Sequence, residues 1–248
     1  YATSDNGLAA LIYGASEVEA KVANGQIVRF KEETNYPFSD KINFEYLTDE
    51  NVRFPLHLRI PGWCNNPKLK INGVMKEIEP SNNILIIERK WKHGDEVELT
   101  LPMEIRTSRW YENSVGIERG PLVYALKIDE EWREVKKVEY PNSFYEVKPL
   151  SPWNYGFYME TFEEGNYQIS INDEINPMPW NTENAPVKIN IEASRIPEWK
   201  MYNKSAGPIP SPNYPTSNYE QYKEIVTLIP YGCTALRVAE FPVVRKPR

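Results

Sequence analysis

Side chains able to perform acid, base or nucleophilic chemistry are few in this 248-residue chain. Its two histidines are His57, on the polar face of an expected strand, and His93, in a turn of sequence Trp-Lys-His-Gly-Asp. Arg53 and Arg59 share the face of His57 and disfavour the protonated imidazole, which makes it a weaker base. The sequence contains no Gly-x-Ser-x-Gly elbow, phosphate-binding glycine loop or His-Glu-x-x-His motif. We therefore predict no catalytic residue.

Two cysteines, Cys64 and Cys233, allow at most one disulfide bond and exclude a zinc site built only from thiolates. Cys64 follows Pro-Gly-Trp in a turn and has no basic residue immediately beside it that would lower its pKa. No second cysteine stands at metal-ligand spacing. We predict that Cys64 is structural and unreactive, and we predict no metal site.

Carboxylates and tryptophans are abundant. The 35 acidic residues contain no pair that sequence alone singles out as the catalytic pair of a glycosidase. Trp153 and Trp180 lie in the proline-rich stretches SPWNYG and MPWN, which we expect to be loops, where a β-sandwich displays function. An exposed indole can stack on the apolar face of a sugar ring, or it can fill a corner of a core. Trp153 and Trp180 are therefore candidate sugar-stacking residues, with structural packing as the alternative.

Alternation of apolar and polar residues predicts the elements that would position these side chains. In Arg53–Ile60, every second residue from Phe54 onward is apolar. Further strands are predicted at Gln26–Glu33, Ile42–Leu47, Lys68–Ile71, Ile84–Glu88, Glu96–Leu101, Val115–Glu118, Pro121–Lys127, Tyr167–Ile171, Val187–Glu192, Glu224–Ile229 and Ala235–Phe241. Short strands with close turns predict an all-β fold, and we find no helix of ten or more residues.

The regularity of this pattern changes along the chain. Residues 1–128 alternate regularly, residues 129–219 hold long connectors rich in proline and aromatic residues, and regular strands return at 224–241. We predict two antiparallel β-sandwich, jelly-roll-like domains. The first comprises residues 1–128, completed by strands from 220–248, and the second comprises residues 129–219.

Charge and composition restrict the partners. The formal net charge is −6 and no block of five basic residues occurs, which disfavours a nucleic-acid partner. No apolar run approaches the roughly 18 residues of a membrane span. The chain begins Tyr-Ala-Thr without a methionine or a secretory signal. We expect a processed protein or a fragment of a longer one.

Several short stretches, in order, resemble the C-terminal region of glycoside hydrolase family 127, the β-L-arabinofuranosidase-type enzymes. They are RIPGW at 59–63, ING at 71–73, WKHGD at 91–95, VELTLPM at 97–103, RGPLVYAL at 119–126, APV at 185–187 and LIPYGCTALRVAEFP at 228–242. Each stretch is short, but together they cover nearly the whole chain. The ordered set is what makes the resemblance specific.

The resemblance implies an (α/α)6 barrel that carries catalysis, followed by β-sandwich domains such as those expected here. It also implies a nucleophilic cysteine from an adjacent Cys-Cys pair, near a zinc ion, upstream of a segment like DNGLAALIYGASEV at residues 5–18. This chain has no Cys-Cys pair. The catalytic and zinc-binding residues of the family therefore have no matching positions, and no cofactor is expected in this chain.

Three readings follow. The first is the non-catalytic β-sandwich portion of an enzyme acting on arabinofuranoside-like or related plant glycans, which supports the barrel of the same polypeptide and its dimerisation. The second is a free-standing carbohydrate-binding module that uses the loop tryptophans, and the third is a purely structural interaction domain. The expected partners are the barrel, a second copy of the chain and a glycan. Export to the periplasm or beyond is the expected location.

Overall fold

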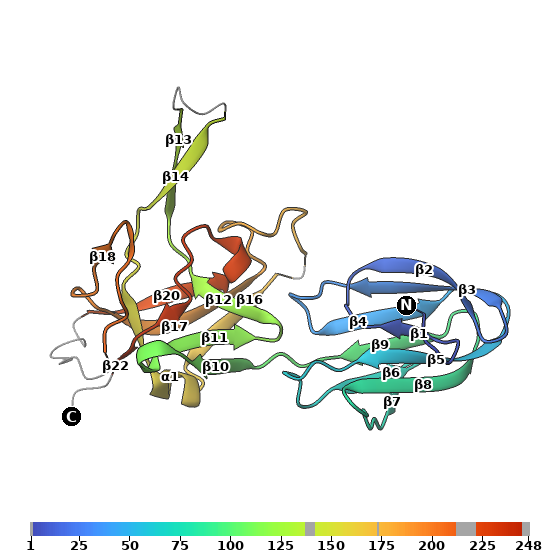
Figure 1. Cartoon of the computed structure of the whole chain (residues 1–248). Coiled ribbons are helices and arrows are strands. Elements are labelled where there is room, and N and C mark those ends of the chain that lie inside the picture. Colours follow the sequence, from blue (N-terminus) through green and yellow to red (C-terminus); the bar gives the residue numbers. More distant parts are fainter. Residues whose placement is uncertain (1, 137–141, 173, 212–221, 245–248) are drawn as a thin grey trace. The chain divides into compact units, whose positions relative to one another are not determined.

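The computed structural model describes residues 2–136, 142–172, 174–211 and 222–244, and this part of the chain is almost entirely strand and loop (Figure 1). The predicted all-β fold is confirmed. Two compact units are present, Tyr1–Glu104 and Ile105–Arg248. The division precedes the predicted one at residue 128, because the strands between residues 105 and 126 pair with one another and with Lys223–Pro230. The strand Lys223–Pro230, which we expected to complete the first domain, thus belongs to the second unit.

The first unit consists of two sheets, with strand orders β2-β3-β4-β9-β6-β7 and β1-β5-β8. Their strands are β1 (Leu8–Ala10), β2 (Ser16–Val22), β3 (Gln26–Thr34), β4 (Lys41–Tyr46), β5 (Val52–Arg59), β6 (Lys68–Ile71), β7 (Val74–Lys76), β8 (Ile84–Trp91) and β9 (Glu96–Thr100). All pairs are antiparallel except β1 with β5, which is parallel.

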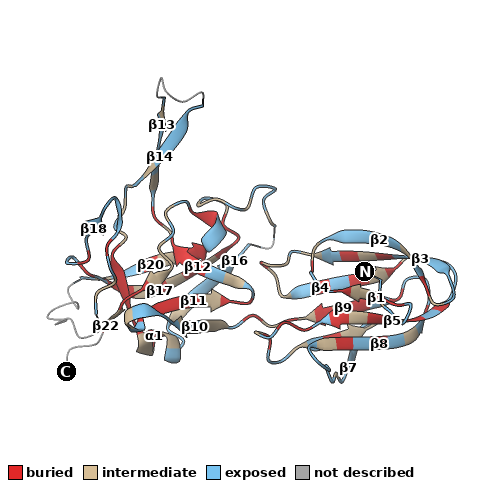
Figure 2. Cartoon of the chain, in the orientation of Figure 1, coloured by how far each residue is buried: buried red, intermediate tan, exposed pale blue. Residues whose placement is uncertain are grey.

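Buried positions lie on the strands of both sheets (Figure 2). The apolar side chains at these positions form one core cluster, so the first unit is a β-sandwich. Trp91 is fully buried, and its indole Nε1 donates to the carbonyl oxygen of Phe54 at 3.0 Å. The ring of Phe30, from the other sheet, lies 5.1 Å from the ring of Trp91 at nearly a right angle. Burial of these large rings supplies much of the favourable free energy of folding.

Two of the stretches that carry the resemblance bind each other in this sandwich. Asp95 of the WKHGD motif is 5% exposed, and its carboxylate accepts hydrogen bonds from Asn72 of the ING motif, from Arg89 and from the backbone of Lys92. The Asn72 side chain in turn accepts from the backbone N–H of Glu96. A buried carboxylate needs such partners. The hydrogen bonds of Asn72 and Asp95 therefore fix two turns.

The packing of the segment before β1 requires a glycine at position 7, in the DNGL stretch. Gly7 N donates to Thr3 Oγ1 at 2.9 Å, which closes a tight turn. A Cβ atom on Gly7 would lie 2.3 Å from the carbonyl oxygen of Pro55 in the neighbouring strand. Only glycine allows the two backbones to approach this closely.

The second unit is built around one nine-stranded sheet of order β10-β11-β12-β20-β17-β15-β22, with β16 beside β17 and β21 beside β11. Two hairpins, β13–β14 and β18–β19, complete it. The strands are β10 (Ile105–Arg109), β11 (Val115–Arg119), β12 (Leu122–Leu126), β13 (Glu130–Val135), β14 (Phe144–Pro149), β15 (Tyr155–Tyr158), β16 (Tyr167–Ile171), β17 (Val187–Arg195), β18 (Met201–Tyr202), β19 (Ser205–Ala206), β20 (Lys223–Pro230), β21 (Glu240–Phe241) and β22 (Val243–Val244). The helical segments described are η1 (Tyr111–Asn113), α1 (Met159–Glu163) and η3 (Tyr231–Cys233).

This sheet curls back on itself. Strand β21 pairs with β11 and β22 pairs with β15, and Pro242 between them accepts a hydrogen bond from the N–H of Phe157 at 3.0 Å. The rings of Phe157 and Phe241 lie 4.7 Å apart inside the curve. The second unit thus encloses its core with one curved sheet, where we expected two facing sheets. None of the helices in the described ranges is long and apolar enough to cross a membrane.

The strand predicted at Ala235–Phe241 is reduced to its last two residues. The backbone N–H groups of Ala235 and Leu236 donate to the carboxylate of Glu130 and not to a neighbouring strand. A long-range side chain thus overrides the local alternation.

Candidate functional site

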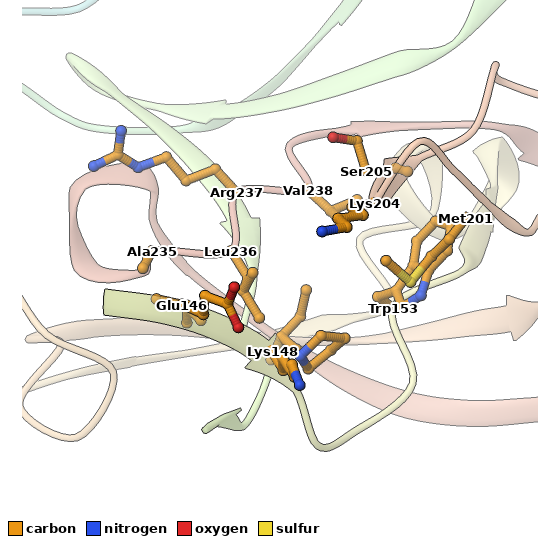
Figure 3. A pocket seen from close by; sticks show the side chains of 14 residues that line it. Glu146, Lys148, Trp153, Met201, Lys204, Ser205, Ala235, Leu236, Arg237 and Val238 are labelled. Atoms are coloured by element: carbon orange, nitrogen blue, oxygen red, sulfur yellow. The ribbon is translucent and has the colours of Figure 1, made fainter. Parts of the chain in front are cut away.

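A hollow of about 950 Å³ lies in the second unit at the base of the β13–β14 hairpin (Figure 3). Residues 146–149 of the hairpin, residues 235–238, and the β18–β19 hairpin form its walls, and Ile128 and Trp153 complete its lining. We call it the hairpin-base hollow. Its volume falls within the range of known ligand sites.

Trp153 is held firmly in this hollow. Its ring lies 5.0 Å from that of Trp199 in an edge-to-face arrangement, and Trp199 Nε1 donates to the carbonyl oxygen of Gly207 at 2.9 Å. The next residue, Asn154, is buried, and its Nδ2 donates to the carbonyl oxygens of Ile196 and Trp199 at 2.7 and 3.2 Å. Trp199 and Asn154, the two neighbours of Trp153, are thus held in place by hydrogen bonds. The partly exposed indole of Trp153 therefore loses little conformational freedom when it contacts a ligand.

Glu130 fixes one wall of the hollow. Its Oε1 atom accepts hydrogen bonds from the hydroxyl of Thr234 and from the N–H groups of Ala235 and Leu236, at 2.8, 2.7 and 3.2 Å. Burial alone would raise the pKa of this carboxyl group, but the hydrogen bonds outweigh it and hold the pKa below its usual value. The ionised Glu130 therefore ties residues 234–236 to the base of the hairpin.

The charged groups that line the hollow are mostly cationic. Lys148, Lys204 and Arg237 line it together with one carboxylate, Glu146. Arg237 is held at the rim, since its Nε donates to the carbonyl oxygen of Thr234 and its guanidinium lies 4.9 Å from the ring centre of Tyr231. Among the ion pairs formed by described residues, none includes any of these four charged groups.

The structure separates the two tryptophans singled out from the sequence. Trp153 lines the hairpin-base hollow, whereas Trp180 does not. Trp180 is 49% exposed and covers Gly232, where an added Cβ would lie 2.9 Å from the indole. A sugar-stacking role for either residue stays a prediction. Lys148, Met201 and Lys204 were not anticipated as site residues, because only the pairing of distant segments brings them to Trp153.

Both cysteines are free and buried. Burial raises the pKa of the Cys64 thiol, and it raises that of Cys233 to about 11. The Sγ atom of Cys233 donates to the carbonyl oxygen of Pro179 at 3.4 Å. Neutral, enclosed thiols are poor nucleophiles, and this environment supports the prediction that Cys64 is structural.

Neither histidine is arranged as the base of a nucleophile–base pair. His57 Nε2 lies 2.9 Å from Asp5 Oδ2, and the hydroxyl of Thr3 donates to the other oxygen of Asp5. In a catalytic triad the nucleophilic hydroxyl donates to the imidazole, whereas here the Thr3 hydroxyl donates to the carboxylate of Asp5. His93 is exposed and lies near the carbonyl oxygen of Leu47. In the ranges that the structure describes, no cluster of three or more His, Cys, Asp or Glu side chains is placed to hold a metal ion.

Comparison with known proteins agrees with the resemblance seen in the motifs. Residues 7–103, almost all of the first unit, match the family model described as the middle domain of GH127 β-L-arabinofuranosidase. A crystal structure of Ara127N, a GH127 β-L-arabinofuranosidase from Geobacillus stearothermophilus T6, matches 98% of this chain at 24% identity with a TM-score of 0.64. A structure described as a glycoside hydrolase matches 96% at 20% identity with a TM-score of 0.61.

A GH127 β-arabinofuranosidase also matches over 96% of this chain, at 21% identity with a TM-score of 0.58. The chain covers 35%, 36% and 35% of these three structures, which is about a third of their length. No curated protein matches the chain. At such identities the structures show a shared fold. The family model over residues 7–103 and the shared fold agree with a partial GH127 region, as the motifs indicated.

Proposed function

We propose that the chain is a non-catalytic, accessory β-structured region of a glycoside hydrolase that acts on arabinofuranoside-like or related plant glycans. The observation that carries this proposal is the match of the first unit to the GH127 middle-domain model, within a fold shared over nearly the whole chain. The two cysteines are not adjacent in sequence, so the Cys-Cys nucleophile that the resemblance implies has no counterpart here.

In this proposal the two units support a catalytic barrel of the same polypeptide. They also take part in dimerisation. The coverage of about a third of each matched structure leaves room for such a barrel in a longer polypeptide. The periplasm or the extracellular medium is the proposed location, because plant glycans are encountered there.

An activity assay tests the accessory role. The purified chain is incubated with an aryl β-L-arabinofuranoside, in parallel with the longer polypeptide that carries the barrel. We expect release of the aryl alcohol by the longer polypeptide alone. Sustained turnover by the isolated chain would show that it contains a catalytic site and would refute the proposal.

A second candidate function is carbohydrate binding, and the position of Trp153 in the hairpin-base hollow favours it. Aromatic rings with a fixed orientation and nearby polar groups are typical of sites that bind amphipathic ligands. Calorimetric titration with plant oligosaccharides tests this role. Trp153→Ala should weaken the binding, whereas Trp180→Ala, which removes an indole outside the hollow, is the matched control. If both substitutions weakened the binding equally, the hairpin-base hollow would not be the carbohydrate-binding site.

A further inference from the structure

We propose that the hairpin-base hollow binds carbohydrate chains that carry carboxylate groups, such as oligosaccharides of uronic acids. This inference rests on the candidate carbohydrate-binding function and adds the charge of the ligand. It assigns ligand-binding roles to Trp153, Lys148 and Lys204.

The charge of the lining favours an anionic ligand. The chain as a whole has a formal net charge of −6, yet the hollow is lined by three cationic side chains and one carboxylate. None of the ion pairs in the described part of the chain includes Lys148 or Lys204, although Glu131 lies across the hairpin from Lys148. Figure 3 shows both side chains lining the same space as Trp153. An anionic ligand would complement this excess of cationic lining groups.

The apolar part of the lining decides the class of the anion. Trp153, Met201, Leu236, Val147 and Pro149 line the hollow together with the cations. A small free anion gains nothing from such a surface. A uronic acid residue has both an apolar ring face that stacks on an indole and a carboxylate that pairs with a lysine.

One face of the β13–β14 hairpin continues from the hollow and carries aromatic rings. Val147 pairs with Trp132 across the hairpin, so their side chains share one face, and the rings of Trp132 and Tyr145 lie 6.0 Å apart. Both rings are more than half exposed, at 56% and 58%. The opposite face places Glu131 beside Lys148 and Arg133 beside Glu146. The aromatic face offers a second stacking position for a longer carbohydrate chain.

Titration calorimetry of the whole chain tests the proposal, with a tetramer of galacturonic acid, a neutral tetrasaccharide and free acetate as probes. We expect the acidic tetramer to bind at least about tenfold more tightly than the neutral one at low salt, with the preference shrinking at high salt. Acetate should not bind. A dimer of galacturonic acid should bind more weakly than the tetramer, because it does not reach the hairpin face.

Substitutions in the hollow test whether the preference for the acidic tetramer arises there. The double variant Lys148→Gln/Lys204→Gln should lose about three- to tenfold in affinity for the acidic tetramer and keep its affinity for the neutral one. Lys76→Gln/Lys90→Gln, which removes the same charge from exposed sites in the first unit, is the control and should bind as the unmodified chain does. Trp153→Ala should weaken the binding of both tetramers.

The outcomes separate this inference from the function on which it rests. Equal affinity for the two tetramers, or an unchanged preference in the hollow double variant, would overturn the inference and leave carbohydrate binding standing. Absence of binding to either tetramer at millimolar concentration would overturn both. Tighter binding of a polyglutamate peptide, insensitive to Trp153→Ala, would overturn the glycan assignment in favour of an acidic protein partner.

Discussion

Replacing Glu32 with glutamine should remove a pH-dependent loss of stability from the first unit. Glu32 lies on the inner face of β3 and is only 3% exposed. Its Oε1 atom accepts a hydrogen bond from the N–H of Gly14 at 2.8 Å, while Oε2 has no hydrogen-bond partner in the described part of the chain. Burial raises the pKa of Glu32 from 4.5 to about 7, against the opposing effect of the Gly14 bond.

The sign and size of the effect follow from this pKa. Because the folded state holds the proton more tightly than the unfolded state, the free energy of unfolding falls as pH rises from about 4.5 to about 7. Above this window the loss is complete. At about 1.4 kcal/mol per pKa unit, the loss is on the order of 3 kcal/mol. The neutral amide in Glu32→Gln avoids this loss and can still accept from Gly14.

Urea denaturation of the full chain at pH values from about 5 to about 8 measures the effect, and hydrogen exchange assigns it to the first unit. The variant should resemble the unmodified protein near pH 5 and be more stable near pH 8 by up to about 3 kcal/mol. Glu33→Gln, which changes the exposed neighbour on the same strand, serves as the control. A stability difference that is constant with pH, or no gain near pH 8, would refute the reasoning.

Three further predictions concern other parts of the chain. Gly7→Ala should destabilise the first unit by about 1–3 kcal/mol in urea denaturation, because the new Cβ would overlap the carbonyl of Pro55; a neutral effect would show that β1 shifts freely. Glu130→Gln should cost about 1–3 kcal/mol and accelerate hydrogen exchange at residues 234–236. Because the pKa of Glu130 is lowered in the folded state, its contribution is present above the normal pKa and is lost as pH falls through the folded value; a variant difference that persists at low pH would contradict this. Iodoacetamide should modify Cys64 and Cys233 slowly in the native protein and rapidly in urea, since burial raises both pKa values; rapid native labelling of Cys64 would show that it is accessible.

The sequence by itself determined the elements whose pattern is local. Alternation in Arg53–Ile60 predicted the strand observed at Val52–Arg59, because successive side chains of a strand point to opposite faces whatever the strand pairs with. The same alternation failed at Ala235–Phe241, where the decisive partner is Glu130, more than a hundred residues away in sequence. The ordered motifs also indicated the resemblance with which the family model agrees, and two of them, containing Asn72 and Asp95, form turns joined by a hydrogen bond.

Tertiary structure alone decided which residues share a site. Trp153 and Trp180 have similar proline-rich surroundings in sequence, yet one lines the hairpin-base hollow and the other covers Gly232. Likewise, Lys148 and Lys204 line the same hollow only because two hairpins and the segment after Cys233 converge. Side-chain alternation is set by each strand's own backbone, whereas the hollow and its charge arise from contacts between distant segments, which no local pattern encodes.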